Sequence, residues 1–498
     1  MIQDGGQIIS GTNNSSSTGA GGNLTVNASE SVEMIGGKGD FPSVLSSVTD
    51  GEGDAGKIKI TTRQLSVRDG AQIQTSTDVD SKGNAGNLEV NVSEFIHIIG
   101  TTPGGEFPSA LVANTSGIGN AGKLILNGKQ LLIDDGAEIS ASTSGGEGGS
   151  IFVDFNSLEA KNGGRLRTST SANNRAGSIT LKVADNIILS GADSGIFANT
   201  TPESQGDGGN IFIDPPRVTI RDGAKIAVDS QGTGIGGDVE LIAGFLTLDN
   251  GEITAATRSN TGGDVTLNLQ ELLLLRNGTK ISTTAGNNQF GGDGGNITIN
   301  SPFIVAVSQE DSDITANAFS GRGGRVDIKT DGIFGIQSQS QLTDFSDITA
   351  SSDLGVDGEI FIDNPDVNPS KGVEELPADV VNAAGLINQN LCTAARRGSE
   401  FVIIGRGGLP ASPHNVGNVN STWEDWSIAR ESEISPPKPI KRDNQSTRKN
   451  ESKTPIVEAQ GWIFDNNGDI IFTAFPVQVT AKDTWLHPND CQRLRVNS

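Results

Sequence analysis

The sequence predicts an all-β fold, a right-handed parallel β-helix of about twelve coils followed by a small C-terminal β-rich module. One motif recurs twelve times, its glycine followed by two aliphatic residues at alternating positions, with 26 to 36 residues between successive glycines. A period near 30 residues is typical of stacked repeats, and helix-forming residues are sparse before about residue 378. The anchor glycines are Gly22, Gly56, Gly86, Gly122, Gly149, Gly177, Gly209, Gly237, Gly263, Gly295, Gly324 and Gly358.

Each anchor glycine opens a short run in which aliphatic residues alternate with others, as in Gly122-Lys-Leu-Ile-Leu126. This period of two predicts a strand with one buried face. In a β-helix, each coil adds one rung and inward side chains stack on their counterparts one rung away. The expected inward residues include Leu124, Leu126, Ile139, Ile179, Leu181, Ile211, Ile213, Ile297 and Ile299.

A second alternating run follows in each repeat, and in one set it passes through an Asp-Gly or Asn-Gly turn into a third run. Asp222-Gly223 is one such turn, and we expect positive φ there. Other repeats replace this turn with a loop, such as Ile98 to Leu111. We therefore expect about three short strands and three turns per repeat. Antiparallel hairpins fit poorly because most connections are too long, and a β-propeller, the alternative, usually has longer blades with aromatic signatures.

The composition narrows the class of protein. Of 498 residues 66 are glycine, and the formal charge of −24 argues against nucleic-acid binding. No apolar run approaches the roughly 18 residues of a transmembrane helix. No signal peptide is visible, and Met1 leads directly into a degenerate turn at Asp4-Gly5. We expect the chain to be the C-terminal part of a longer protein.

The composition changes after the last repeat, which divides the chain into five segments. We predict β-helix repeats over residues 1–363, a linker over 364–377, and a C-terminal module in two parts, 378–426 and 456–498. A Pro-, Ser- and Lys-rich linker, 427–455, separates the two parts. The second part contains a strand–turn–strand pattern with an Asn-Gly turn.

The only two cysteines, Cys392 and Cys491, bracket this module. A disulfide between them would close a loop of about 100 residues and stabilise the module by roughly 4–5 kcal/mol in the chain-entropy model. Such a bond would suit an oxidising, extracellular setting. Two unpaired thiols remain the alternative.

The repeats and the tail together resemble the large filamentous-haemagglutinin-like exoproteins of cyanobacteria. The tandem Gly-x-aliphatic-x-aliphatic and Asp-Gly-Ala repeats carry part of this resemblance. The tail residues that carry the rest are Cys392, Gly405, Arg406, Gly407, Gly408, Leu409, Pro410, Trp423, Gly461, Trp462 and Cys491.

The resemblance implies two-partner secretion, in which an outer-membrane β-barrel transporter recognises an N-terminal secretion domain and a long β-helix is displayed outside the cell. Neither that domain nor a signal peptide is visible in this chain. The resemblance also implies an extracellular or cell-surface location and a non-enzymatic role in adhesion or surface structure. Surface glycans and neighbouring cells are the partners we expect, because the outward faces are rich in Ser, Thr, Asn and Gln.

Catalytic motifs are weak. His97, His414 and His487 are far apart and lie in no metal or triad motif. The stretch Gly232-Thr-Gly-Ile-Gly-Gly237 matches the dinucleotide pattern, but chance explains it in a glycine-rich chain where no helix follows.

A carbohydrate-active β-helix enzyme is the alternative function, with the outward carboxylates Asp313, Asp327 and Asp347 as candidates. Asp313 and Asp347 occupy the same place in two copies of Ser-Asp-Ile-Thr-Ala, about one coil apart. We expect no cofactor except weakly bound calcium on turns such as those at Asp207 and Asp293, where ordinary turn chemistry is the alternative.

Overall fold

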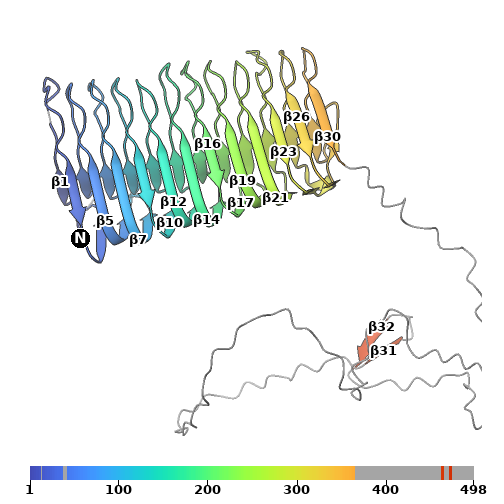
Figure 1. Cartoon of the computed structure of the whole chain (residues 1–498), viewed down its shortest axis with the longest axis horizontal. Helices are drawn as coiled ribbons and strands as arrows, with labels where there is room; N and C mark the ends of the chain where they lie inside the picture. Colours follow the sequence, from blue (N-terminus) through green and yellow to red (C-terminus); the bar gives the residue numbers. More distant parts are fainter. Residues whose placement is uncertain (13, 38–41, 365–460, 465–469, 474–498) are drawn as a thin grey trace, which may run out of the picture. The chain divides into compact units, whose positions relative to one another are not determined.

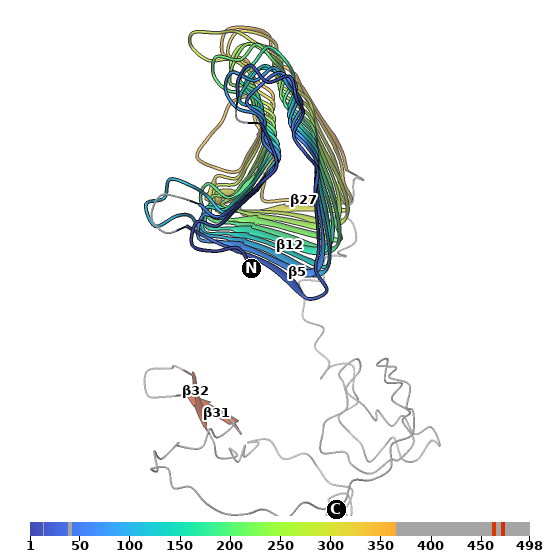
Figure 2. The same cartoon turned by 90° about the vertical axis from the view of Figure 1, so that its left-hand side faces the viewer.

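The computed structural model describes residues 1–12, 14–37, 42–364, 461–464 and 470–473. These residues belong to two units, which we describe separately. The first is an all-β parallel solenoid of about 11 turns, so the prediction of an all-β fold built from a parallel β-helix is confirmed. Consecutive turns stack along one axis from β1 (Gln7–Ile9) to β30 (Glu359–Asp363) (Figure 1). Viewed along that axis the turns superpose (Figure 2).

The solenoid contains two long sheets, in which strands of successive turns pair in parallel. The 13-stranded sheet, here the narrow sheet, has one short strand per turn. Its strands, in spatial order after β1, are β4 (Val44–Ser46), β6 (Gln72–Gln74), β8 (Ala110–Val112), β11 (Glu138–Ser140), β13 (Arg165–Arg167), β15 (Gly195–Phe197), β18 (Lys225–Ala227), β20 (Glu252–Thr254), β22 (Lys280–Ser282), β25 (Asp313–Thr315), β29 (Asp347–Thr349) and β28 (Gln337–Ser338). The twelve strands from β1 to β29 are separated by eleven steps, which matches the twelve repeats of the sequence.

The 17-stranded sheet, here the wide sheet, contains the anchor motif and the run that follows it. Its strands are β2 (Leu24–Asn27), β3 (Ser31–Ile35), β5 (Ile58–Arg68), β7 (Leu88–Ile99), β9 (Leu124–Asn127), β10 (Gln130–Asp134), β12 (Ile151–Lys161), β14 (Ile179–Ser190), β16 (Ile211–Asp214), β17 (Arg217–Arg221), β19 (Val239–Asp249), β21 (Val265–Arg276), β23 (Ile297–Asn300), β24 (Phe303–Ala306), β26 (Arg325–Lys329), β27 (Gly332–Phe334) and β30. A single 3-10 turn, η1 (Ser308–Glu310), is the one helical element of the described solenoid. No helix among the described residues is long and apolar enough to cross a membrane.

The expectation of three separate short strands per repeat holds in only part of the solenoid. In six turns the first two runs join into one strand of 11 or 12 residues, namely β5, β7, β12, β14, β19 and β21. The register shifts inside these strands, for example between Phe155 and Ser157. A bulge of this kind bends a strand without ending it, so two alternating runs in the sequence become one strand.

The core consists of stacked aliphatic side chains, as predicted. All nine inward residues named from the sequence are at most 1% exposed. Ile179 stacks between Ile151 and Ile211 of the neighbouring turns, and the same register continues through Val239. Burial of such side chains stabilises a fold by roughly 25 cal/mol per Å² of apolar surface, so each turn depends on its two neighbours for most of its stability.

The anchor glycines from Gly56 onward form a column in which each lies against the backbone of the preceding turn. A Cβ atom on Gly177 would overlap the carbonyl oxygen of Gly149, and one on Gly209 would overlap that of Gly177. The preceding position is tight as well, because a Cβ on Gly208 would approach the nitrogen of Gly237. The small-residue-glycine motif therefore follows from the close approach of neighbouring turns.

The Asp-Gly and Asn-Gly turns have the expected backbone conformation. Asp69, Asp135 and Asp222 have φ between 54° and 58°, and Asn250 and Asn277 lie in the same interval. Asn and Asp tolerate this left-handed region better than other non-glycine residues, which explains why they recur at this corner of the solenoid.

Hydroxyl groups form rows inside the solenoid, and several of them, such as those of Thr143 and Thr283, bond backbone carbonyls. Buried threonines follow one another through parallel bridges in six consecutive turns: Thr49, Thr77, Thr115, Thr143, Thr170 and Thr200. In a neighbouring row, the Thr283 hydroxyl donates a 2.8 Å hydrogen bond to the carbonyl oxygen of the anchor Gly295. Thr283 is fully buried, so this bond is shielded from water.

Substituting Thr283 with valine should lower the free energy of unfolding by about 1–2 kcal/mol, because the buried Gly295 carbonyl loses its hydroxyl donor. Thr283→Ser, which keeps the donor, is the matched control and should cost less. Urea denaturation followed by circular dichroism measures both. A loss in Thr283→Val no larger than that in Thr283→Ser would contradict a stabilising role of this hydrogen bond.

The last strand edge of the narrow sheet is covered by the chain itself. β28 precedes β29 in sequence but lies outside it in the sheet, with Gln339 N donating to Ile348 O at 3.0 Å. An edge strand left open is prone to pair with other chains, and β28 occupies that edge here.

The second unit contributes an antiparallel pair, β31 (Gly461–Phe464) and β32 (Ile470–Thr473), with Trp462 opposite Phe472. The two strands predicted in the last segment are therefore present. The other predicted features of the tail lie outside the described residues. They are the cysteine pair Cys392 and Cys491, the motif Gly405 to Pro410, Trp423, His414, His487 and both linkers.

Candidate functional site

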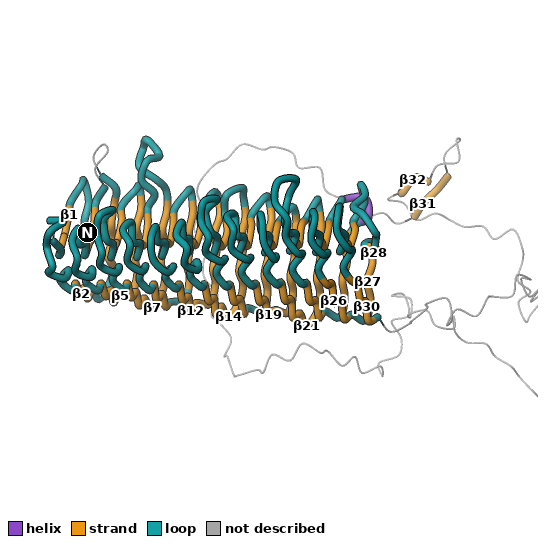
Figure 3. The backbone as a smooth tube through the Cα atoms, turned by 90° about the horizontal axis from the view of Figure 1, so that it is seen from above, coloured by secondary structure: helices purple, strands orange, loops and turns teal. Residues whose placement is uncertain are grey.

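Loops flank the strands of the narrow sheet along the solenoid (Figure 3). The outer face of this sheet carries a succession of hollows. Four hollows run from β1 to β20, with volumes of about 230, 520, 300 and 320 Å³. Each shares lining residues with the next: Val48 and Gln74, then Arg165 and Arg167, then Gln231. We refer to these four together as the groove.

The largest hollow lies over β6, β8, β11 and β13. Gln72, Gln74, Asn114 and Ser116 supply neutral polar groups to its lining, which also includes Asp78. These residues are outward-facing because they alternate with the buried Ile73 and its counterparts. This part of the surface thus offers both hydrogen-bond donors and acceptors to a ligand.

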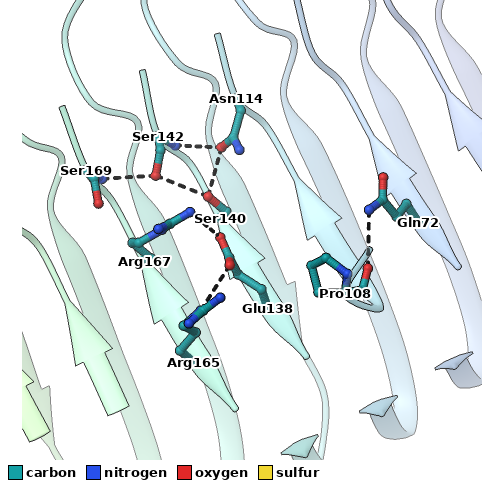
Figure 4. Close-up of polar contacts among 9 residues, drawn as sticks. All are labelled: Gln72, Pro108, Asn114, Glu138, Ser140, Ser142, Arg165, Arg167 and Ser169. Atoms are coloured by element: carbon teal, nitrogen blue, oxygen red, sulfur yellow. Dashed lines mark hydrogen bonds and ion pairs between the residues drawn. The ribbon is translucent and has the colours of Figure 1, made fainter. Parts of the chain in front are cut away.

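One charged cluster stands out in this hollow (Figure 4). Arg165 Nε donates to Glu138 Oε2 at 3.0 Å, and Arg167 Nη2 donates to Glu138 Oε1 at 2.9 Å. The Glu138 side chain is only 7% exposed, whereas those of Arg165 and Arg167 are 36% and 40% exposed. Parallel pairing causes this arrangement, because β11 and β13 place Glu138 beside Arg165 and Ser140 beside Arg167.

A chain of hydrogen bonds fixes the backbone next to this cluster. Asn114 Oδ1 accepts from Ser140 Oγ at 2.9 Å and from Ser142 N at 2.6 Å. Ser142 Oγ in turn accepts from Ser169 N at 3.0 Å (Figure 4). These bonds link three successive turns, so the strands that carry Glu138 and the arginines are held in register.

The two arginines separate the largest hollow from the next one along the groove. They line both, and the second hollow adds Phe197, Asn199 and Asp193. Phe197 is the register partner of Arg167 one turn further on. A ligand lying along the groove would therefore meet the guanidinium groups and then an aromatic ring.

The structure brings together two of the three carboxylates proposed from the sequence. Asp347 N donates to Asp313 Oδ1 at 3.0 Å, and Asp347 Oδ2 accepts from the backbone N–H and hydroxyl of Thr343. Burial raises the pKa of Asp313 to about 6, and the neighbouring charges of Asp311 and Asp347 act in the same direction. Asp347 is 1% exposed and serves as a structural acceptor.

The third carboxylate lies elsewhere, so the three do not form one site. Asp327 is on β26 of the wide sheet. The Arg325 guanidinium donates two hydrogen bonds to it and holds its pKa below the usual range. Asp327 occupies the second alternating position of an anchor motif, which places it on the outer face of the other sheet.

Asp313→Asn and Asp327→Asn should change stability with opposite signs at neutral pH. Because the folded-state pKa of Asp313 is raised, the folded protein binds this proton more tightly, and stability is lost as pH rises from about 3.8 to about 6. Asp313→Asn should therefore raise the melting temperature at pH 7 and leave it nearly unchanged at pH 4.

The lowered pKa of Asp327 stabilises the fold above the unfolded value of about 3.8, and this contribution is lost on acidification. Asp327→Asn should accordingly lower the melting temperature at pH 7. Differential scanning calorimetry at both pH values measures the pair, and a lower melting temperature for Asp313→Asn at pH 7 would contradict the assignment.

The two aspartates considered as calcium ligands accept hydrogen bonds from backbone N–H groups of the next turn of the solenoid. Asp207 Oδ1 accepts from Ile235 N at 3.0 Å, and Asp293 Oδ1 accepts from Arg322 N at 2.7 Å. In the part of the chain that the structure describes, no three His, Cys, Asp or Glu side chains gather so that they could hold a metal ion. These bonds join successive turns of the solenoid, 28 and 29 residues apart, and do not close the local turns expected from the sequence.

The structure also locates His97 and the glycine-rich stretch that matches the dinucleotide pattern. His97 lies on β7, where its ring stacks on Phe95 with centroids 4.1 Å apart, and burial lowers its pKa. The segment from Gly232 to Gly237 connects β18 to β19 and leads into a strand.

The comparisons with protein families, with curated proteins and with solved structures give no match to this chain. The groove and its charged cluster therefore carry the functional argument. The cluster could have been found in the sequence by aligning Glu138-Ile-Ser with Arg165-Leu-Arg, which are equivalent positions of successive repeats.

Proposed function

We propose that this protein is a non-enzymatic filament of the cell surface or extracellular space, adhesive or structural in role, whose full-length form is exported by two-partner secretion. The observation that carries the proposal is the groove, a polar surface built from equivalent outward positions of successive turns. The resemblance of the repeats and of the tail to filamentous-haemagglutinin-like exoproteins supports the secretion route.

The geometry of a solenoid suits the binding of extended polymers. Neighbouring parallel strands are about 4.8 Å apart, so equivalent polar side chains recur at short, regular intervals along the groove. A linear glycan or a neighbouring cell-surface polymer can then make several weak contacts at once, which together give useful avidity. An outer-membrane transporter is the partner we propose for export, and surface glycans are the partners we propose outside the cell.

Antibodies raised against the solenoid provide the test. We expect them to label intact producing cells, and we expect protease treatment of those cells to remove the label. Detection only after lysis would contradict a surface role. A cytosolic protein of the same cells, probed in parallel, reports whether the envelope stayed intact.

A carbohydrate-active enzyme remains the second candidate, favoured by one observation: a carboxyl of raised pKa, Asp313, stands beside Asp347. General acids of glycosidases have such raised pKa values. Glycan-array binding by the full chain without release of new reducing ends supports the adhesive role. Release of reducing ends that Asp313→Asn abolishes would support the enzyme instead.

A further inference from the structure

We propose that Glu138, Arg165 and Arg167 form the anchoring site for a carboxylate-bearing polysaccharide, a uronate chain that lies along the groove. The inference rests on the proposed function and specifies the chemistry of its ligand. It predicts that the carboxylates of the sugar, and not only its hydroxyl groups, determine where the chain binds.

Glu138 acts as a positioning residue in this site. Its two carboxylate oxygens each accept one arginine, and its side chain is almost completely buried. The guanidinium groups are thereby held in place while more than a third of each arginine side chain remains exposed. A guanidinium fixed in this way loses little rotamer entropy on binding and can offer its remaining N–H groups to a carboxylate.

The charges of the site do not cancel. One carboxylate and two guanidinium groups leave a charge of +1, in a chain whose formal charge is −24. Among the described residues, Arg167 Nε is buried and has no hydrogen-bond partner. Asp78 lines the first hollow and Asp193 the second, so attraction for an anion is confined to the cluster between them.

The neighbouring groups fit a sugar polymer better than a small anion. Phe197 lies one turn beyond Arg167, and its ring can pack against the apolar face of a pyranose. Gln72, Gln74 and Asn114 lie on the other side and can bond hydroxyl groups. The two hollows measure about 520 and 300 Å³, within the range usual for ligand sites.

Calorimetric titration of the full chain with a purified oligogalacturonate tests the proposal, and the fully methyl-esterified oligomer is the matched neutral ligand. We expect the acid form to bind at least tenfold more tightly than the ester, with an affinity that falls as NaCl is added. Arg167→Gln should weaken binding of the acid form about tenfold or more, while binding of the ester changes little.

Arg63→Gln is the matched control, because Arg63 also bridges two groups, Glu30 and Glu94, but contacts no hollow of the groove. It should bind like the unmodified protein. Arg167→Lys keeps the positive charge but lacks the planar guanidinium group, so its affinity should lie between those of the unmodified protein and Arg167→Gln. This second variant keeps the test decisive if Arg167→Gln does not fold. Melting curves of all variants establish that they fold.

Equal affinity for acid and ester, no binding of the acid form, or unchanged affinity in a folded Arg167→Gln would each overturn the carboxylate site. None of these results would remove the label from intact cells, so the surface role and the anchoring site can fail independently.

Discussion

Replacing Gly177 with alanine should destabilise the solenoid severely, by about 4 kcal/mol or more. The new Cβ would overlap the carbonyl oxygen of Gly149 and would also lie too close to the carbonyl carbon of Gly148. All of these are backbone atoms of the neighbouring turn, so no side chain can rotate away to make room. The turns on either side must separate, which also disturbs the core and the ladder bonds there.

The position of Gly177 near the middle of the stack makes the effect distinctive. In a repeat array, stability is the sum of the turns and of the interfaces between neighbouring turns. A broken interface should divide the solenoid into two parts that unfold separately, and the single-transition approximation then fails. We expect a lowered and broadened thermal transition by circular dichroism, and new cleavage near residue 177 in limited proteolysis.

Gly104→Ala is the control for this substitution. A Cβ at Gly104 meets no atom within 4 Å, and its φ is not in the left-handed region. This variant should melt like the unmodified protein. If Gly177→Ala also melted unchanged, the close approach of the glycine column would be refuted.

Replacing Phe155 with alanine should cost about 3–5 kcal/mol. Phe155 is among the largest fully buried side chains, with 1% exposure, and it lies at the bulge of β12 where two alternating runs join. Its ring lies close to Gly128, where an added Cβ would meet the phenyl carbons. Truncation would leave a cavity that the stacked turns, fixed by their ladder bonds, can close only in part.

Phe152→Ala on the same strand is the matched control, since Phe152 faces outward and is 42% exposed. It should cost less than about 1 kcal/mol, because an exposed side chain gains little from folding. Urea denaturation of both variants gives the comparison. Similar losses would mean that β12 does not place its residues on alternate faces as described.

Much of the fold follows from period and composition. The inward aliphatic residues could be assigned because alternation fixes the face of each strand. The sequence did not predict that two alternating runs join into one strand, as they do in β12. A bulge at Asn156 interrupts the alternation of buried and exposed residues in the same way as the end of a strand. The repeat likewise identified Gly177 as an anchor position. The physical reason for glycine there is the short distance between neighbouring turns, which the sequence of one strand does not show.

The adjacency of site residues was predicted only where two repeats have identical residues. Asp313 and Asp347 stand in identical pentapeptides, so their adjacency could be foreseen. Glu138 and Arg165 differ in charge, and the turn before Arg165 has Gly164 in place of the alanine found in other copies. Their pairing was therefore missed, although an alignment of the two repeats around Ile139 and Leu166 would have given the register that the strands show.

The glycine column has a consequence for the gene that encodes it. The interfaces between turns share the column of anchor glycines and the stacked aliphatic residues, so equivalent positions of different turns have similar packing requirements. We therefore expect that the deletion or duplication of one whole repeat in the gene leaves a junction between turns that still packs. Glu138 pairs with Arg165 and Arg167 at the junction between β11 and β13. A change in the number of other turns would therefore leave this charged cluster intact.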